Sequence, residues 1–181
     1  EIAAVNAPSG LAAIETPQDL IRTTQVVVGT IEAEAGADAA IIGAFGDPGL
    51  IEARGRLSIP VVGLGEAGLK AAANGRRFSI VTLGEAMRAA VAERVRSLGL
   101  NDRLAEIRIL PIAIPDMIAN RDAHFGAIAD AIRHCTGDAV LLGGAPLAGL
   151  GNKMTEETGV TVLDGVEASV TAAMRMLGSG V

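Results

Sequence analysis

Residues 37–50 read ADAAIIGAFGDPGL, and residues 137–150 read GDAVLLGGAPLAGL. Each passage places an apolar run after an aspartate and follows it with a turn of small residues. The likeness continues, because SIPVVGLGEA at residues 58–67 corresponds to GVTVLDGVEA at residues 159–168. An internal repeat indicates repeated structure, so the chain is predicted to form two related lobes whose small-residue turns face each other across a cleft.

Short unbroken runs of Ile, Val, Leu and Ala alternate with helical stretches along the chain. Such runs are typical of parallel strands covered on both faces, so the pattern predicts an α/β fold of mainly parallel sheets flanked by helices. The expected strands are residues 2–5, 39–43, 60–64, 78–82, 107–112, 139–143 and 160–163. The expected helices are residues 17–35, 49–56, 66–74, 85–98, 122–134, 148–157 and 166–177. We expect a first lobe at residues 1–76, a second at 77–164, and a C-terminal helix within 165–181 that returns to the first lobe.

Composition limits the function classes that the chain fits. Its 181 residues carry a formal net charge of −6 without a basic stripe and contain no Trp or Tyr, so nucleic acid is not an expected partner. No apolar run reaches the ~18 residues of a membrane helix. Cys135 is the only cysteine, which leaves no partner for a disulfide within these residues and favours a reducing, cytoplasmic location. No metal and no other cofactor are expected, because no ligand cluster is present.

Turns of small residues follow four of the predicted strands, at residues 43–49, 82–85, 143–148 and 163–166. In open α/β sheets, ligands bind at the carboxyl ends of strands. Small residues there let backbone N–H groups approach a carboxylate or imide oxygen. Gly, Pro and Asp are also ordinary turn formers, so each turn taken singly is interpreted as a turn without a ligand role.

A glycine pattern at residues 63–68 resembles the fingerprint of a dinucleotide site, and Glu85 lies about twenty residues further on. However, Thr82 rather than an acidic residue ends the next strand. The repeat of the pattern, at residues 164–169, has also lost the glycines, because Asp164, Val166 and Ser169 stand at their positions. A dinucleotide cofactor is therefore not favoured.

Four titratable residues need an interpretation. Asp47 either acts as a general base or caps the helix that begins at Pro48 and Gly49, and capping is favoured. Cys135 is interpreted as a small buried hydrophobic residue rather than a nucleophile. His124 and His134 are interpreted as surface residues rather than bases.

Six segments carry a resemblance to a known family: VNAPSG at residues 5–10, GAFGDPGL at 43–50, PVVGLGEA at 60–67, RFSIVT at 77–82, LGGAPLA at 142–148 and VLDGV at 162–166. They resemble the hydantoin and allantoin racemase branch of the aspartate/glutamate racemase superfamily. The resemblance implies two pseudo-symmetric lobes and cofactor-independent stereoinversion of a small amino-acid derivative, such as a hydantoin, in a homo-oligomer. The implied ligand carries a carboxylate or imide group and contacts the turns. The expected ligand-binding residues are Ala44, Phe45, Gly46, Thr82, Leu83, Gly144, Ala145 and Pro146.

The chain departs from that family at the catalytic positions. The family uses two cysteines on opposite faces of the substrate carbon, one to remove the α-proton and one to return a proton. Ala44 and Gly144 stand at these positions, and neither side chain carries a proton to transfer. Because the first repeat has Ala, we expect the second position to tolerate a side chain as well. Three interpretations stay open: a relative with different chemistry, a ligand-binding relative without catalysis, or a variant altered to trap ligand.

The catalytic residues are therefore unassigned, with Asp47 as a candidate. The polar side chains near the predicted strand ends are those of Asp47, Glu66, Thr82 and Asp164. The family's opening strand and helix are missing ahead of residue 1, so the first lobe is expected to be incomplete.

Overall fold

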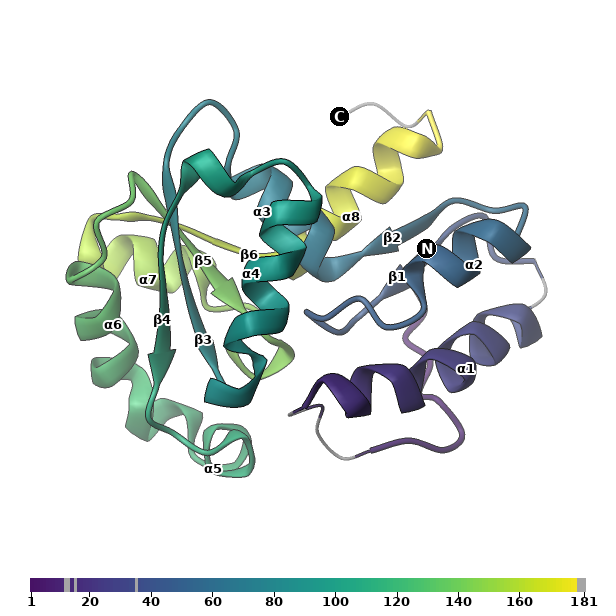
Figure 1. The fold of residues 1–181 in the computed structure, drawn as a ribbon, viewed down its shortest axis with the longest axis horizontal. Coiled ribbons are helices and arrows are strands. Elements are labelled where there is room, and N and C mark those ends of the chain that lie inside the picture. The colour runs from purple at the N-terminus through teal and green to yellow at the C-terminus, as the bar shows by residue number, and fades with distance from the viewer. Residues whose placement is uncertain (12–13, 15, 35, 179–181) are drawn as a thin grey trace.

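The computed structural model describes residues 1–11, 14, 16–34 and 36–178, which contain two separate parallel sheets (Figure 1). The smaller sheet pairs β1 (Ala40–Ile42) with β2 (Val61–Gly63). The larger sheet has the order β4-β3-β5-β6, with β3 (Phe78–Leu83), β4 (Leu104–Leu110), β5 (Ala139–Gly143) and β6 (Thr161–Asp164). After β4 the chain crosses to the other side of β3, so the strand order reverses between β3 and β5, where α/β sheets open a crevice for ligands.

Helices connect the strands. They are α1 (Pro17–Ala33), α2 (Leu50–Arg56), α3 (Leu64–Ala72), α4 (Arg88–Ser97), α5 (Ile114–Ala119), α6 (Phe125–Arg133), α7 (Gly151–Thr158) and α8 (Gly165–Met176). The 3-10 turns of the described residues are η1 (Glu85–Met87), η2 (Asn101–Arg103), η3 (Arg121–His124) and η4 (Ala145–Leu147). The start of α1 shows how local sequence sets a boundary. Thr16 and Asp19 bond to each other's backbone N–H groups in a capping box, and Pro17 occupies the first turn.

The two central strands of the larger sheet, β3 and β5, are buried at every position, and β5 is apolar throughout. Val140 and Leu142 on β5 pack in the core that includes α6 and α7, whereas Leu141 packs in the core that includes α3 and α4. Since successive side chains of a strand point to opposite faces, an unbroken apolar run lets one strand serve both cores. All five residues of β5 are buried.

The smaller sheet is covered in the same way by different helices. Val28, Leu50 and Ala53, from α1 and α2, pack with Ile42 and Val61 on one face. On the other face Val62 packs with residues of α3 and α8. The helix α8 contacts α3 as well as strands of both sheets, so α3 and α8 join the two parts of the molecule (Figure 1).

The expected α/β architecture of parallel sheets flanked by helices is confirmed. Six of the seven expected strands are present, one with the expected ends (139–143) and five with shifted ends. The strand expected at residues 2–5 is wrong. Ile2 and Val5 are 74% and 50% exposed, and no strand pairs with them. A short apolar run forms a strand only where a neighbouring strand satisfies its backbone.

Helix ends also moved. The helix expected at residues 148–157 begins at Gly151, after a separate turn at η4. The last residue of the expected helix 17–35 and the last three residues of the chain lie outside the described residues. The division at residues 76 and 77 stays a prediction.

Candidate functional site

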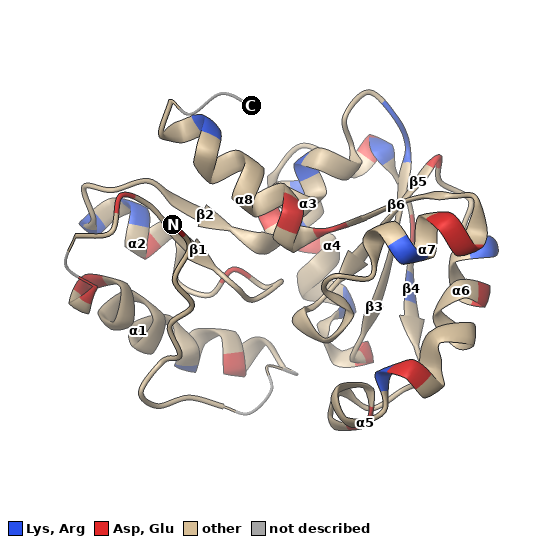
Figure 2. Ribbon diagram, turned by 180° about the vertical axis from the view of Figure 1, so that it is seen from behind, with Lys and Arg blue, Asp and Glu red and all other residues tan. Residues whose placement is uncertain are grey.

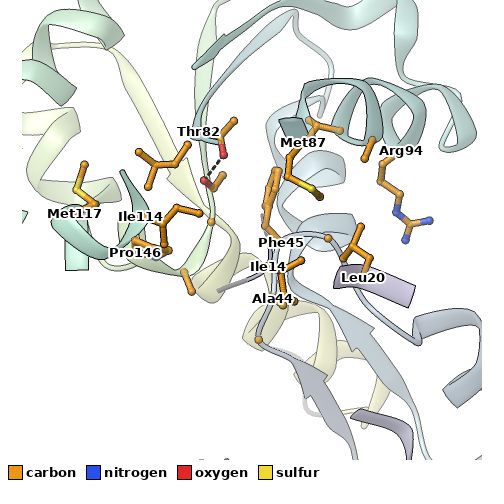
Figure 3. Close-up of a pocket in the computed structure, with 18 of the residues that line it drawn as sticks. Ile14, Leu20, Ala44, Phe45, Thr82, Met87, Arg94, Ile114, Met117 and Pro146 are labelled. Carbon is orange, nitrogen blue, oxygen red and sulfur yellow. Dashed lines mark hydrogen bonds between the residues drawn. The ribbon is translucent and has the colours of Figure 1, made fainter. Parts of the chain in front are cut away.

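A cavity of about 610 Å³ opens where β1, β3 and β5 end. All eight of the residues expected to bind ligand line it: Ala44, Phe45, Gly46, Thr82, Leu83, Gly144, Ala145 and Pro146. They come from segments that follow or end these three strands, so the two repeated turns meet at one space, as the internal repeat predicts. In Figure 3, Ile114, Met117 and Pro146 lie on one side of the opening, and Ile14, Leu20 and Ala44 lie on the other. That these residues bind a ligand stays a prediction.

Sequence reasoning missed one wall of the cavity. Ile114, Met117 and Ile118 line it from α5, a helix that was not expected, and Arg121 lines it from η3. A signal was available, because Pro115 and Asp116 stand in the first turn of α5, where proline and acidic residues are favoured. Leu20, Met87 and Arg94 were also missed, because α1, η1 and α4 reach the cavity only through tertiary packing.

The lining is mostly apolar. Among the described lining residues, the side chains with a polar hydrogen are those of Thr82, Arg94 and Arg121. The hydroxyl of Thr82 is buried and donates to the carbonyl oxygen of Gly143 at 2.7 Å, across the pair β3–β5 (Figure 3). This bond fixes the end of β3 against the second turn. The arrangement can enclose an apolar group and exclude water, and none of its described side chains is an ordinary acid or base.

Ala44 and Gly144, the positions at which the resemblance implies cysteines, differ in backbone. Gly144 has φ 113° and ψ 142°, a conformation that L side chains rarely adopt. Ala44 has an ordinary backbone, since Asp47 is the only non-glycine residue with positive φ in the described part of the chain. The positive φ of Gly144 argues against the expectation that position 144 tolerates a side chain, because a side chain there would be strained even though a Cβ would have space, 3.6 Å from Pro146 and 4.0 Å from Thr82.

Asp47 does not line this cavity, and it does not cap the helix expected at Pro48 and Gly49. The cap of α2 is Gly49, and no side chain bonds there. Instead, the carboxylate accepts hydrogen bonds from the backbone N–H groups of Gly65 at 2.8 Å and Glu66 at 2.7 Å, in the first turn of α3. Asp47 therefore does cap a helix, as expected, but the helix is α3 and not the one that follows it directly. Gly65, its first partner, lies 18 residues further along the chain.

A cation also holds Asp47. Arg94 on α4 donates from Nη2 to Asp47 at 3.3 Å and to Glu66 at 2.9 Å. Burial raises the pKa of the Asp47 carboxyl, and the N–H groups of Gly65 and Glu66, together with Arg94, oppose that rise. For Glu66, burial raises the pKa, but hydrogen bonds from Lys70 and Arg54 outweigh it and lower the pKa below its ordinary value.

The glycine pattern at residues 63–68 has a packing explanation. A Cβ on Gly63 would lie 2.4 Å from the carboxylate carbon of Asp47, and one on Gly65 would lie 2.0 Å from the carbonyl oxygen of Phe45. One on Gly68 would approach Leu141 on β5 at 3.0 Å. These glycines therefore let α3 approach the first turn and the larger sheet. The carboxylate of Asp47 occupies the helix N-terminus where a dinucleotide would place its phosphates.

The remaining candidates lie away from the cavity lining. Cys135 is half-buried beside the core and donates to the carbonyl oxygen of Ala131 at 3.3 Å, and burial raises the pKa of its thiol. His124 contacts Asp116 at 2.8 Å, and His134 contacts the carbonyl oxygen of Asp130 at 2.7 Å. These contacts agree with the interpretation of these residues as structural or surface groups.

Of the four expected strand-end residues, only Thr82 lines the cavity, and Asp47, Glu66 and Asp164 serve helix ends or ion pairs. Asp164 caps α8 through the N–H groups of Val166 and Glu167, and Glu66 pairs with Arg54, Lys70 and Arg94. In the described residues, no group of three or more His, Cys, Asp or Glu side chains could hold a metal ion. No described helix is long and apolar enough to cross a membrane.

Comparison with known proteins shows the family. The family model described as Asp/Glu/Hydantoin racemase matches residues 1–173. The chain belongs to this family. A hydantoin racemase from Pseudomonas sp. (strain NS671) is 32% identical over 187 aligned positions, which cover 99% of this chain and 75% of that protein.

Solved structures of the family agree with the fold. The allantoin racemase from Klebsiella pneumoniae superposes with a TM-score of 0.92 at 28% identity, over 98% of this chain and 76% of that one. The allantoin racemase from Pseudomonas fluorescens gives 0.90 at 28% identity, over 99% of this chain and 80% of that one. The arrangement of sheets and helices described above is therefore that of the racemases.

Proposed function

We propose that this chain is a cofactor-independent, racemase-type protein whose cavity receives a small amino-acid derivative such as a hydantoin, without a two-thiol relay. One observation carries the proposal. The turns that follow β1 and β5, which hold Ala44 and Gly144, line the same cavity. The racemase family inverts the configuration of a substrate carbon between these two turns. The reacting carbon of a ligand would therefore lie in the part of the cavity where the turns meet.

The chemistry of the lining supports a small organic ligand. Backbone N–H groups of the turns suit a carboxylate or imide oxygen, and the apolar walls suit a hydrocarbon substituent. Hydantoin and allantoin, which the names of the relatives mention, both contain imide-like N–H and C=O groups. Cofactor independence is supported by the first turn of α3, because the carboxylate of Asp47 already fills it.

A second function has its own support. Inversion needs an acid and a base on opposite faces of the carbon. Among the described lining residues, only Thr82, Arg94 and Arg121 have polar hydrogens, and none has an ordinary pKa near neutrality. The alternative is therefore a protein that binds the ligand and leaves its stereochemistry unchanged.

Deuterium exchange separates the two functions. Single enantiomers of hydantoins and amino acids are incubated with the protein in D₂O, and the α-proton is followed by NMR beside a protein-free control. Saturable exchange with loss of optical rotation supports the racemase-type function. Saturable binding without exchange supports the binding protein, and absence of binding contradicts both.

We further propose that the chain works as a homo-oligomer in the cytoplasm, apart from nucleic acid, and that residues 1–76 and 77–164 form its two lobes. Light scattering after gel filtration tests the assembly. A monomer at all concentrations would contradict the oligomer. Limited proteolysis tests the lobes, since a stable cut near Gly75 is expected and uniform digestion would contradict the division.

A further inference from the structure

The charge of the cavity differs from that of the whole chain. The chain has 21 acidic and 15 basic residues, and both signs are spread over its helices (Figure 2). Nevertheless, no acidic side chain is among the described lining residues, whereas two arginines are, Arg94 and Arg121. The charged side chains at the described cavity wall are therefore all cationic.

The two arginines are not equivalent. The guanidinium of Arg94 lies against the carboxylates of Asp47 and Glu66, which compensate its charge. Arg121 makes one bond, from Nη1 to the carbonyl oxygen of Ala148 at 3.0 Å. No carboxylate of the described residues lies within the 4.0 Å of an ion pair from its guanidinium, although Asp122 follows it in sequence. Arg121 is thus held in place by a neutral acceptor, and no carboxylate of the described residues compensates its charge.

The bond to Ala148 orients this charge. It ties η3 to the residue that follows η4, and η4 contributes Ala145 and Pro146 to the same cavity. A guanidinium has five N–H donors in a rigid fork, so one bond to a carbonyl leaves donors for a planar anion. The apolar wall of α5, with Ile114, Met117 and Ile118, lies beside this donor.

We propose that Arg121 binds a carboxylate on the substituent of the ligand, so that the preferred ligands are hydantoin-like rings with an anionic arm rather than wholly apolar ones. The inference rests on the proposed function, because it assumes that the cavity holds such a ring. It makes Arg121 a specificity-determining residue. If Arg121 only held η3 against the residue after η4, its replacement would weaken the binding of charged and neutral ligands equally.

A matched pair of ligands tests the proposal. The hydantoins of glutamate and glutamine have the same shape and differ by one negative charge. Binding of both is measured by calorimetry at low and high salt, to the wild type and to Arg121→Gln, Arg121→Lys and Arg103→Gln. Arg103, on η2 at the opposite end of β4, controls for the loss of one positive charge.

Because Arg121 is exposed, we expect the wild type to bind the acid roughly 2–5-fold more tightly than the amide, as an exposed ion pair allows. Arg121→Gln removes that preference, Arg121→Lys keeps part of it, Arg103→Gln keeps all of it, and salt reduces it. Equal binding of the two ligands by the wild type, or a preference that survives Arg121→Gln, overturns the role of Arg121. If Arg121→Gln does not fold, the role of Arg121 is judged from three other results. These are the preference of the wild type for the acid, the salt dependence of that preference and the preference of Arg121→Lys. Failure of both ligands to bind instead contradicts the proposed function.

Discussion

The guanidinium of Arg94 on α4 lies 3.3 Å from the carboxylate of Asp47, which belongs to the loop after β1. The pair links a helix of the larger sheet to a loop of the smaller sheet. The carboxylate also caps α3, so a single side chain serves two helices. Asp47 has φ 49°, which aspartate and asparagine tolerate better than other side chains do.

Asp47→Ala is expected to lower the free energy of unfolding by about 2–3 kcal/mol, since it removes the cap and leaves alanine in a left-handed conformation. Asp47→Asn keeps one acceptor and tolerates the backbone, so its loss is smaller. Urea unfolding of both variants measures the difference, with Asp102→Ala on η2 as the surface control. Equal stability of Asp47→Ala and the control would show that the cap contributes nothing.

Glu66→Gln is expected to destabilise the protein at neutral pH and to have little effect in acid. The pKa of Glu66 is lowered from its ordinary 4.5, although burial opposes this, because Lys70 and Arg54 stabilise the carboxylate. A lowered pKa in the folded state contributes stability above the unfolded pKa, and this is lost as the pH falls through the folded value. Thermal unfolding of both proteins between neutral pH and about pH 3 should show their difference shrinking below about pH 4.5. A difference that stays constant over that range would contradict the ion-pair role.

Ala44→Cys and Gly144→Cys are expected to differ in stability. Position 44 accepts the side chain with ordinary backbone angles, whereas cysteine at φ 113° costs about 1–3 kcal/mol. Urea unfolding of each single variant measures the costs. Equal stability would mean that the turn relaxes to admit a side chain.

The same variants test the chemistry. A single thiol at position 44 can remove and return a proton on one face, so Ala44→Cys should exchange the α-proton of a hydantoin with little inversion. The double variant, if folded, should add inversion. Loss of optical rotation by Ala44→Cys alone, at the rate of its exchange, would contradict the requirement for two faces.

Gly65→Ala is expected to disturb the cavity, because its Cβ would lie 2.0 Å from the backbone oxygen of Phe45, which cannot move without shifting the turn. Gly29→Ala, in the middle of α1, meets nothing within 4 Å and should raise stability by about 0.5–1 kcal/mol. Thermal unfolding and hydantoin binding distinguish the two. Normal binding by Gly65→Ala would mean that the first turn does not need its present position.

The sequence predicted most of the larger sheet because its strands are rich in Ile, Val and Leu and lie between clear turns, and β5 is an unbroken apolar run. Residues 139–143 form β5 with the expected ends. The repeated turns were recognised for a similar reason, since small residues after a buried strand occur twice. Residues 2–5 have the same apolar character and form no strand, because composition does not reveal whether a partner strand is present.

Long-range contacts account for most of what could not be predicted. The partner of Asp47 is the first turn of α3, and nothing local to Asp47 indicates it. The positive φ of Gly144 was also hidden, because the repeat has Ala at the equivalent position. Arg121 was not predicted as a site residue, because the sequence does not show that its guanidinium lies at the cavity without a carboxylate beside it.

The three hydrogen bonds of the Asp47 carboxylate have a mechanical consequence. The loop that holds Ala44 starts from the smaller sheet, yet these bonds fasten it to α3 and α4, which pack on the larger sheet. The loop is therefore held at β1 by the chain itself and at α3 and α4 by hydrogen bonds. Because Asp47 lies three residues after Ala44, these bonds limit how far the turn at Ala44 can move relative to α3 and α4, and so help to keep the spacing between the turns at Ala44 and Gly144.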